Sequence, residues 1–321
     1  MQALRRLGRS DLWVTPVAMG CWPISGITSV DVTEAQSLAT IEAAFHAGIN
    51  FFDTAYSYGF EGESERMLGQ VLGPHRDAVV IATKCGIHWE SGQQARDARP
   101  ATIRRQCDES LLRLQTDRID LYYLHAPDPQ VSIAESAGAI GDLIAAGKVR
   151  TAGASNFSRE QLAEFHGVCP LSVYQPHFNM LQREIEDSQL PWCVEQEVSL
   201  AVYWPLMKGL LAGQLSREHV FHERDGRKKY PMFQGDEWRK NQDFLDQLRT
   251  LATRLNRSIA EIVINWTTQR TGITSALCGA KRPSQIRDNA AAMFWELSAA
   301  DVALIDRWIA ERGPTVSRGA V

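Results

Sequence analysis

The 321-residue sequence lacks the usual marks of a secreted or membrane-spanning protein. Its six cysteines are scattered, with no Cys-x-x-Cys pair and no spacing typical of a disulfide framework. No hydrophobic run approaches the roughly 20 residues that a membrane-spanning helix needs, and the first residues lack the apolar core of a signal peptide. These absences predict free thiols in a reducing compartment and therefore a cytoplasmic protein.

An excess of charge of one sign is also missing. The formal net charge is −4, and the basic residues form no stripe or run. Nucleic acid and anionic membranes are therefore not expected as partners. The apolar content of 44% is sufficient for a full core, and the length suits a single α/β barrel domain spanning residues 1–321.

Eight short apolar runs alternate with amphipathic helical stretches along the chain. Most of the runs are nearly continuous, as expected for strands that are covered on both faces. Eight βα repeats with right-handed crossovers favour a closed (β/α)8 TIM barrel. The runs are residues 17–22, 49–53, 79–84, 118–125, 149–155, 171–178, 199–206 and 274–280.

An open, doubly wound sheet is the competing fold. Such sheets usually carry a G-x-G-x-x-G turn after the first strand. Here the first run continues into the segment MGCWPISG, which lacks that glycine spacing, so we favour the barrel.

Two segments fall outside the repeats. The residues before the first run predict an N-terminal β-hairpin around residues 8–11, which would close the barrel floor. Residues 213–240, after the seventh strand, are polar, charged and long, and such loops in compact domains are usually functional. We expect this loop to overhang the face formed by the C-terminal ends of the strands.

Capping patterns mark several helix boundaries. Thr33 with Gln36, and Ser258 with Glu261, have the spacing of a capping box at a helix N-terminus. Pro283 suits the first turn of a helix after the last strand.

Four polar residues lie at the ends of three of the runs. Asp53 ends residues 49–53, Tyr58 lies in the turn that follows, Lys84 ends residues 79–84, and His125 ends residues 118–125. Each has an ordinary explanation alone, such as a helix cap or a core histidine. Parallel strands, however, deliver the residues at their C-terminal ends to one face, so together the four predict a proton-handling site.

The chemistry of these four side chains suits a carbonyl group. A free tyrosine has a pKa near 10, and a neighbouring ammonium stabilises the phenolate, so we expect Lys84 to lower the pKa of Tyr58. Asp53 would orient Lys84 and keep it protonated, and a neutral His125 would donate a hydrogen bond to the substrate. The set offers no obvious nucleophile and no metal cage, so we expect a bound hydride donor.

Nine segments, in order and spacing, resemble the aldo-keto reductase superfamily, in particular its bacterial and plant branch. The resemblance covers residues 7 to about 292. It implies a (β/α)8 barrel and a catalytic tetrad of Asp53, Tyr58, Lys84 and His125, in which Tyr58 is the general acid/base. The segments are LGRSDLWVTPVAMGCW, GINFFDTAYSYG, GESERMLG, IATK, DLYYLHAPD, GKVRTAGASNF, YQPHFNML, YWPLMKGLLAG and GAKRPSQIRDNAAA.

The resemblance also implies an NADPH-dependent oxidoreductase that reduces aldehydes or ketones, or oxidises a sugar or alcohol, by hydride transfer from nicotinamide C4. Ser155, Asn156 and Gln175 would hold the carboxamide, which needs both donors and acceptors, and Tyr203 would stack on the nicotinamide ring. Further cofactor contacts are implied for Gly20, Cys21, Trp22, Trp204, Leu206, Gly209, Leu211, Gly279, Lys281, Arg282, Gln285 and Asn289.

Positive charge near a helix N-terminus favours NADP(H) over NAD(H). Lys281 and Arg282 precede the helix that opens at Pro283, where a 2′-phosphate would be stabilised. Trp204 and Ala280 stand where many family members carry a hydroxyl residue, which leaves more of the phosphate binding to backbone N–H groups. In the long loop, Asp225 and Arg227 are candidates for a latch over the pyrophosphate.

The substrate side is expected to be aromatic. Trp22, Tyr56, His88 and Trp89, together with the 213–240 loop, are the candidate wall, which favours small-molecule aldehydes, ketones or sugar rings. An alternative function is a non-enzymatic NADP(H)-binding regulatory subunit, similar to the potassium-channel β subunits. A metal-dependent hydrolase would need clustered His and carboxylate ligands at the strand ends, where His125 alone qualifies.

Overall fold

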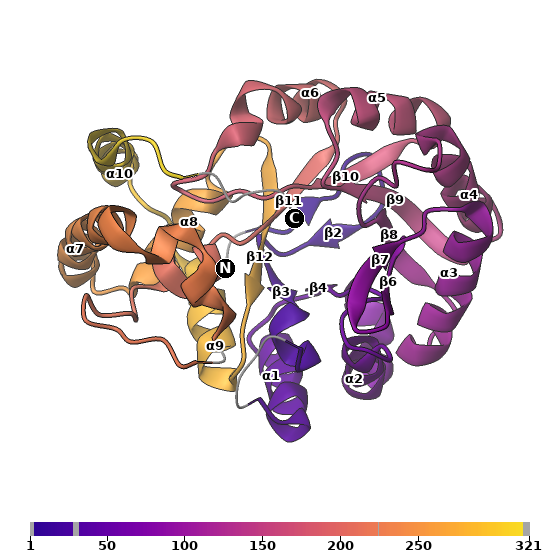
Figure 1. Ribbon diagram of the computed structural model, residues 1–321, viewed down its shortest axis with the longest axis horizontal. Helices are drawn as coiled ribbons and strands as arrows, with labels where there is room; N and C mark the ends of the chain where they lie inside the picture. Colours follow the sequence, from indigo (N-terminus) through magenta and orange to yellow (C-terminus); the bar gives the residue numbers. More distant parts are fainter. Residues whose placement is uncertain (1–2, 28–31, 224, 317–321) are drawn as a thin grey trace.

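The apolar runs pair edge to edge as parallel strands and close into a barrel of eight strands, as expected (Figure 1). The computed structural model describes residues 3–27, 32–223 and 225–316. In spatial order the barrel strands are β3 (Val17–Gly20), β4 (Phe51–Asp53), β5 (Val80–Cys85), β8 (Ile119–Leu124), β9 (Val149–Ser155), β10 (Leu171–Gln175), β11 (Ser199–Tyr203) and β12 (Ile273–Gly279).

The helices surround the barrel and bury the outer faces of its strands (Figure 1). Both predicted capping boxes form, at Thr33 before α1 and at Ser258 before α8, and Pro283 is the first residue of α9. The helices are α1 (Glu34–His46), α2 (Glu63–Leu72), α3 (Pro100–Leu114), α4 (Ile133–Ala145), α5 (Arg159–Val168), α6 (Gln189–Glu195), α7 (Gly235–Leu255), α8 (Ile259–Thr268), α9 (Pro283–Ala291) and α10 (Ala299–Arg312).

Strands β10 and β11 each end three residues earlier than the sequence predicts. β10 stops at Gln175 because Pro176 has no N–H to continue the ladder. β11 stops at Tyr203 because Trp204 adopts a positive φ of 59°, which turns the backbone out of the extended conformation. The early ends place both Gln175 and Tyr203 at the C-terminal rim of the barrel.

The N-terminal hairpin closes the barrel floor, as expected. β1 (Arg5–Arg6) pairs antiparallel with β2 (Trp13–Val14). Leu7, Leu12 and Val14 are buried and pack against residues from the barrel interior, among them Phe51 and Val173. The closed floor leaves the opposite, C-terminal end of the strands for the site.

A second hairpin, which we did not predict, follows β5. β6 (Ile87–Glu90) pairs antiparallel with β7 (Gln93–Arg96), and the turn residues Ser91 and Gly92 have φ values of 50° and 78°. Two successive positive φ values are typical of a tight hairpin turn, so the Ser-Gly pair was the available signal. The hairpin carries His88 and Trp89 beside the turn that bears Tyr58.

The predicted long loop is only partly irregular. After β11 the chain forms a 3-10 helix, η4 (Met207–Ala212), and two further short ones, η5 (Gly226–Lys229) and η6 (Pro231–Phe233). Helix α7 already begins at Gly235, within the stretch that we expected to be loop, and residue 224 lies outside the described residues. Over the described ranges, no helix combines the length and apolar character needed to cross a membrane.

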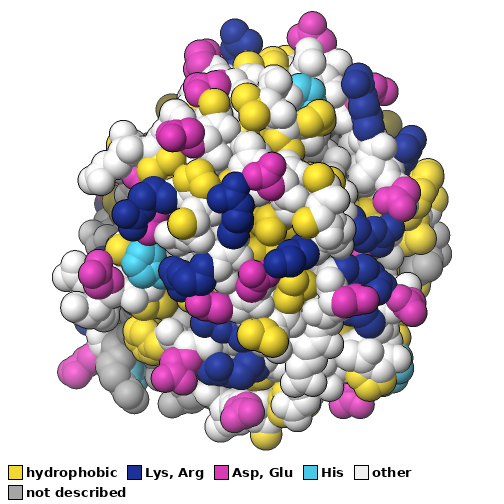
Figure 2. All heavy atoms as spheres, turned by 90° about the vertical axis from the view of Figure 1, so that its right-hand side faces the viewer, with side chains coloured by type: hydrophobic (Ala, Val, Ile, Leu, Met, Phe, Trp, Pro, Cys, Tyr) yellow, Lys and Arg dark blue, Asp and Glu magenta, His cyan; other side chains and the backbone are white. Residues whose placement is uncertain are grey.

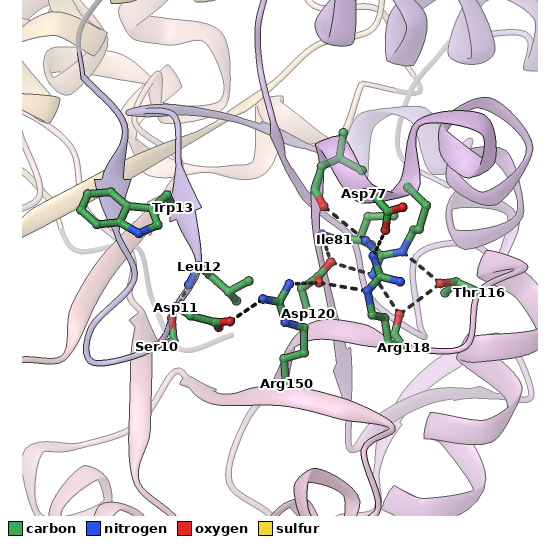
Figure 3. A network of polar contacts seen from close by, with 12 residues as sticks. Ser10, Asp11, Leu12, Trp13, Asp77, Ile81, Thr116, Arg118, Asp120 and Arg150 are labelled. Carbon is green, nitrogen blue, oxygen red and sulfur yellow. Dashed lines mark hydrogen bonds and ion pairs between the residues drawn. The ribbon is translucent and has the colours of Figure 1, made fainter.

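A buried carboxylate organises the barrel floor (Figure 3). Asp120, whose side chain is 0% exposed, lies 2.7 Å from Arg76 Nη2 and 3.0 Å from Arg150 Nη1, and it accepts the N–H of Ile81 at 2.9 Å. Arg150 also contacts Asp11 of the N-terminal hairpin at 2.9 Å. The network therefore joins the hairpin to strands β5, β8 and β9.

We expect Asp120→Ala to lower the free energy of unfolding by about 3 kcal/mol, because it leaves clustered arginines without their shared buried carboxylate. Chemical denaturation followed by circular dichroism measures the loss. Asp117→Ala is the control, since the Asp117 side chain is 89% exposed and 3.5 Å from Arg118. Equal stability of the two variants would contradict the structural role of Asp120.

Candidate active site

The sequence-predicted residues come together at the C-terminal rim of the barrel, each at or near the end of a strand. Asp53 ends β4 and Lys84 is the penultimate residue of β5, while His125 directly follows β8. Tyr58 lies in the turn between β4 and α2, and its N–H donates to the carbonyl of Ala55 at 2.9 Å. The closed barrel thus brings residues that lie far apart in the chain to one place.

Lys84 is the centre of the cluster. Its side chain is 0% exposed, and Nζ donates to Asp53 Oδ1 at 2.6 Å and to the carbonyl of Thr54 at 2.7 Å. The third contact, to the Tyr58 hydroxyl, is longer at 3.4 Å. The 2.6 Å contact confirms the predicted pairing of Asp53 with Lys84. Burial lowers the pKa of Lys84 and raises the pKa of Asp53, and their mutual attraction opposes both shifts.

The pKa of Tyr58 is opposite to our expectation. Burial raises it well above 10, and the negative charge of Asp53 raises it further. Lys84 does not reverse this because its ammonium is paired with Asp53 at 2.6 Å and lies farther, at 3.4 Å, from Tyr58. The phenol is therefore protonated at neutral pH, which is the state of a proton donor.

His125 is neutral, as expected. Its imidazole is half-buried, and burial together with the nearby positive charges of Lys84 and Arg96 holds its pKa well below 6.5. The ring centroids of His125 and Tyr58 are 5.9 Å apart in an edge arrangement. Nδ1 of His125 is buried with no hydrogen-bond partner among the described residues, which is typical of a group that awaits a ligand or water.

Gln175 belongs to the same cluster, a contact that the sequence did not indicate. Its Nε2 donates to Asp53 Oδ2 at 2.6 Å, so both carboxylate oxygens of Asp53 are satisfied. The two residues are separated by 122 positions in the chain and meet only across the closed barrel. Gln175 therefore orients Asp53 in addition to facing the predicted carboxamide site.

The other predicted carboxamide residues form a short hydrogen-bonded chain next to Gln175. Ser155 Oγ donates to the Gln175 carbonyl at 2.8 Å, and Asn156 Nδ2 donates to the carbonyl of His125 at 3.0 Å. The hydroxyl of Tyr203 donates to Asn156 Oδ1 at 2.7 Å. These amide and hydroxyl groups offer both donors and acceptors at one place, so their chemistry fits a nicotinamide carboxamide.

The segment after β11 has an unusual backbone. Trp204, Met207 and Lys208 have positive φ values of 59°, 46° and 54°, and Gly209 follows with 89°. Such conformations cost energy and cluster at active sites and ligand-binding segments. The Lys208 ammonium lies 4.0 Å from the Trp204 ring centroid.

The side chains of several predicted cofactor residues do not reach the surface. Leu211 and Cys21 are buried, and Leu206 is half-buried against the core. Any contact that they make with a cofactor would therefore come mainly from the backbone.

The start of α9 presents the predicted basic turn. Gln285 Oε1 accepts the N–H of Lys281 at 2.8 Å, and Arg282 is exposed at the N-cap position. Asn289 is 3% exposed and lies deeper in the helix. Gly279 ends β12 in register with Gly20 of β3.

The long loop approaches the segment after β11. Asp225 and Arg227 form an ion pair at 2.7 Å, and Arg227 Nη1 reaches the carbonyl of Lys208 at 3.5 Å. Lys281 lies near enough to help Arg227 lower the pKa of Asp225. The predicted latch residues are thus brought to the region where a cofactor phosphate is expected.

The predicted aromatic wall is only partly assembled. The ring centroids of Trp22 and Tyr58 are 5.0 Å apart, and Trp89 Nε1 donates to the carbonyl of Ser57 at 2.9 Å. His88 precedes Trp89 on β6, and adjacent strand residues point to opposite faces, so the two cannot share one wall. Phe60, which we did not predict, is 60% exposed and its ring centroid lies 4.8 Å from that of Trp89.

Tyr56 does not support our prediction that it lines the pocket. Its hydroxyl bonds to Glu109 of α3, and the guanidinium of Arg113, also on α3, lies 4.3 Å from its ring centroid. These contacts turn the side chain toward the outer helices, because the partly buried Glu109 and Arg113 on α3 offer it a hydrogen bond and a cation–π partner.

Comparison with known proteins agrees with this geometry. Residues 16–310 match the sequence model of the Aldo/keto reductase family. The chain is 38% identical over 288 residues to "Aldo-keto reductase YhdN" of Bacillus subtilis, covering 89% of this chain and 87% of that protein. It is 33% identical to the "NADH-specific methylglyoxal reductase" of Escherichia coli, covering 93% of this chain and 96% of that protein.

A solved structure shares both fold and sequence. The glycerol dehydrogenase AKR11B4 from Gluconobacter oxydans superposes with a TM-score of 0.91 at 33% identity, covering 99% of this chain and 98% of that chain. The family binds nicotinamide cofactors and acts on small-molecule carbonyl substrates. The chain therefore belongs to the aldo/keto reductase family of oxidoreductases.

Proposed function

We propose that this protein is an NADP(H)-dependent reductase of aldehydes and ketones, able to run in reverse on a sugar or alcohol, with Tyr58 as the general acid/base. The observation that carries the proposal is the cluster around Lys84: the protonated Tyr58 hydroxyl lies 3.4 Å from a buried ammonium, which Asp53 holds at 2.6 Å. A neutral imidazole, His125, lies beside the same phenol.

Each side chain has a distinct task in the proposed reduction. Tyr58 gives its proton to the carbonyl oxygen of the substrate, and the negative charge left on the phenolate then faces Lys84. Asp53 holds Lys84 in place and favours the charged ammonium, and Gln175 in turn holds Asp53. His125 donates an N–H to the same carbonyl oxygen and so orients the substrate for proton transfer.

The cofactor would be held by residues from the ends of four strands. Ser155, Asn156 and Gln175 would bind the carboxamide, and Tyr203 would pack against the ring. When bound, the nicotinamide supplies the hydride that the protein side chains cannot provide. Lys281 and Arg282, at the N-terminus of α9, would hold a 2′-phosphate, which supports NADP(H) as the preferred cofactor.

The substrate is proposed to be small and uncharged. The protein from Escherichia coli is named a methylglyoxal reductase and the one from Gluconobacter oxydans a glycerol dehydrogenase. Trp22, Trp89 and Phe60 give the rim near Tyr58 an aromatic character that suits such carbonyl compounds and polyols.

We expect Tyr58→Phe to lower kcat for 4-nitrobenzaldehyde by about 100- to 10,000-fold, because the proton donor is lost while the ring is kept. NADPH oxidation measures the rate, and quenching of tryptophan fluorescence measures cofactor binding, which should persist. Tyr122→Phe is the matched control, since its hydroxyl bonds to the Ile103 carbonyl on the outer side of the barrel. Full turnover by Tyr58→Phe would refute the mechanism.

Cofactor preference depends on the basic turn. We expect Lys281→Ala to raise the Kd for NADPH by about 10- to 100-fold, the equivalent of ~1.5–3 kcal/mol for a hydrogen bond to a charged group, and to leave the Kd for NADH nearly unchanged. Fluorescence titration with both cofactors measures the ratio. Lys148→Ala, which removes a surface lysine paired with Asp108, should leave both constants unchanged. Tighter binding of NADH than NADPH by the unmodified protein would overturn the NADP(H) assignment.

A further inference from the structure

Arg113, on the outer helix layer, reaches the turn that bears Tyr58. Arg113 lies near the end of α3, and its side chain is 18% exposed. It does not touch Tyr58, Lys84 or Asp53 in any contact that the structure describes. Its contacts are instead with the residues on both sides of Tyr58 in the sequence.

Arg113 holds the turn at two points. Before Tyr58, Nη1 donates to the carbonyl of Tyr56 at 3.4 Å, and the guanidinium lies 4.3 Å from the Tyr56 ring centroid. After Tyr58, the side chain fills the space beside Gly62, where a Cβ would come within 2.6 Å of Arg113 Cδ, Nε and Nη1. Gly62 has a φ of 79°, so glycine serves both the conformation and the close approach.

A buried carboxylate fixes Arg113 in this position. Glu65 on α2 is 0% exposed, and its Oε2 lies 3.2 Å from Arg113 Nη1. The other oxygen, Oε1, accepts the hydroxyl of Thr83 at 2.6 Å, and Thr83 immediately precedes Lys84 on β5. The pair therefore ties α3, α2 and β5 together directly behind the turn.

The turn and β5 meet again at Lys84. The N–H of Tyr56 donates to the Lys84 carbonyl at 3.0 Å. Among the three contacts of the Lys84 ammonium, the one to Tyr58 is the longest, at 3.4 Å, and it is the one that depends on the position of the turn. A shift of the turn would therefore lengthen this contact first.

We propose that Arg113 is a positioning residue for the reaction: by clamping the Tyr56–Gly62 turn against Glu65 and β5, it holds the Tyr58 hydroxyl beside the Lys84 ammonium. The proposal rests on the proposed function of Tyr58. In this proposal Arg113 acts through the turn, which it contacts at Tyr56 and Gly62.

Charged and titratable groups surround both Arg113 and Tyr58. Glu65 and Glu109 face Arg113 from α2 and from its own helix, at 3.2 and 4.0 Å. Around Tyr58, the groups that affect its proton are Asp53 from β4, Cys21 after β3 and Tyr203 from β11, with Lys84 in contact from β5 and His125 after β8. The described contacts of Arg113 are with the turn and with Glu65, not with Tyr58 itself, so the influence that we propose is geometric.

The test uses the double variant Arg113→Met/Glu65→Gln, which removes the clamp without leaving an unpaired buried carboxylate. We expect kcat to fall about 10- to 100-fold, as for a misplaced catalytic group, with the KM and cofactor Kd unchanged. The basic limb of the kcat–pH profile should move to higher pH, because the phenolate loses its ammonium partner. Arg113→Lys, which keeps the charge but not the planar guanidinium, should show a smaller effect in the same direction and decides the question if the double variant does not fold.

Arg104→Met is the matched control on the same helix, since Arg104 is 48% exposed and pairs with Asp142 at the surface. We expect its kcat and its pH profile to equal those of the unmodified protein. A kcat and pH profile of the folded double variant equal to those of the unmodified protein would overturn the proposal.

A crystal structure of the double variant without cofactor gives a readout that does not depend on turnover. A displaced turn with Tyr58 moved away from Lys84 supports the proposal, and an unchanged distance overturns it. If the unmodified protein and Arg104→Met both fail to reduce any carbonyl compound, the proposed function fails, and the crystal structure alone decides whether Arg113 positions the turn.

Discussion

The buried ammonium of Lys84 is the constraint on which the rest of the site depends. A lysine with 0% side-chain exposure keeps its charge only if carboxylate and carbonyl oxygens replace the lost water. Asp53 supplies that partner from the neighbouring strand, and Gln175 occupies the second carboxylate oxygen from across the barrel. Because the pair is closed in this way, the remaining direction of the ammonium is toward Tyr58.

Buried polar groups are fully paired at one end of the barrel and not at the other. At the floor, Asp120 is surrounded by arginines and a backbone N–H, so its buried charge is fully paired and the closed end contributes stability (Figure 3). At the rim, Ser57 Oγ and His125 Nδ1 are buried without a hydrogen-bond partner among the described residues. Outside the site, the face in Figure 2 shows charges of both signs interspersed, in keeping with the near-neutral net charge.

Local patterns predicted the parts of the fold that local interactions build. The capping boxes at Thr33 and Ser258 form as expected, because each involves residues three positions apart. The barrel and its floor hairpin followed from the strand pattern. The β6–β7 hairpin was missed, although the Ser91–Gly92 turn carried its signal, because neither flanking run is apolar enough to read as a buried strand.

By itself, the sequence determined the order of the elements and which residues end the strands, since the periodicity of burial and the C-terminal delivery of parallel strands are properties of the chain pattern. Only the tertiary structure decided that Tyr56 turns to α3, that Gln175 bonds to Asp53, and that burial raises the pKa of Tyr58. Each of these depends on neighbours that lie far apart in the chain. These neighbours exclude water and bring their charges together only after the barrel has closed.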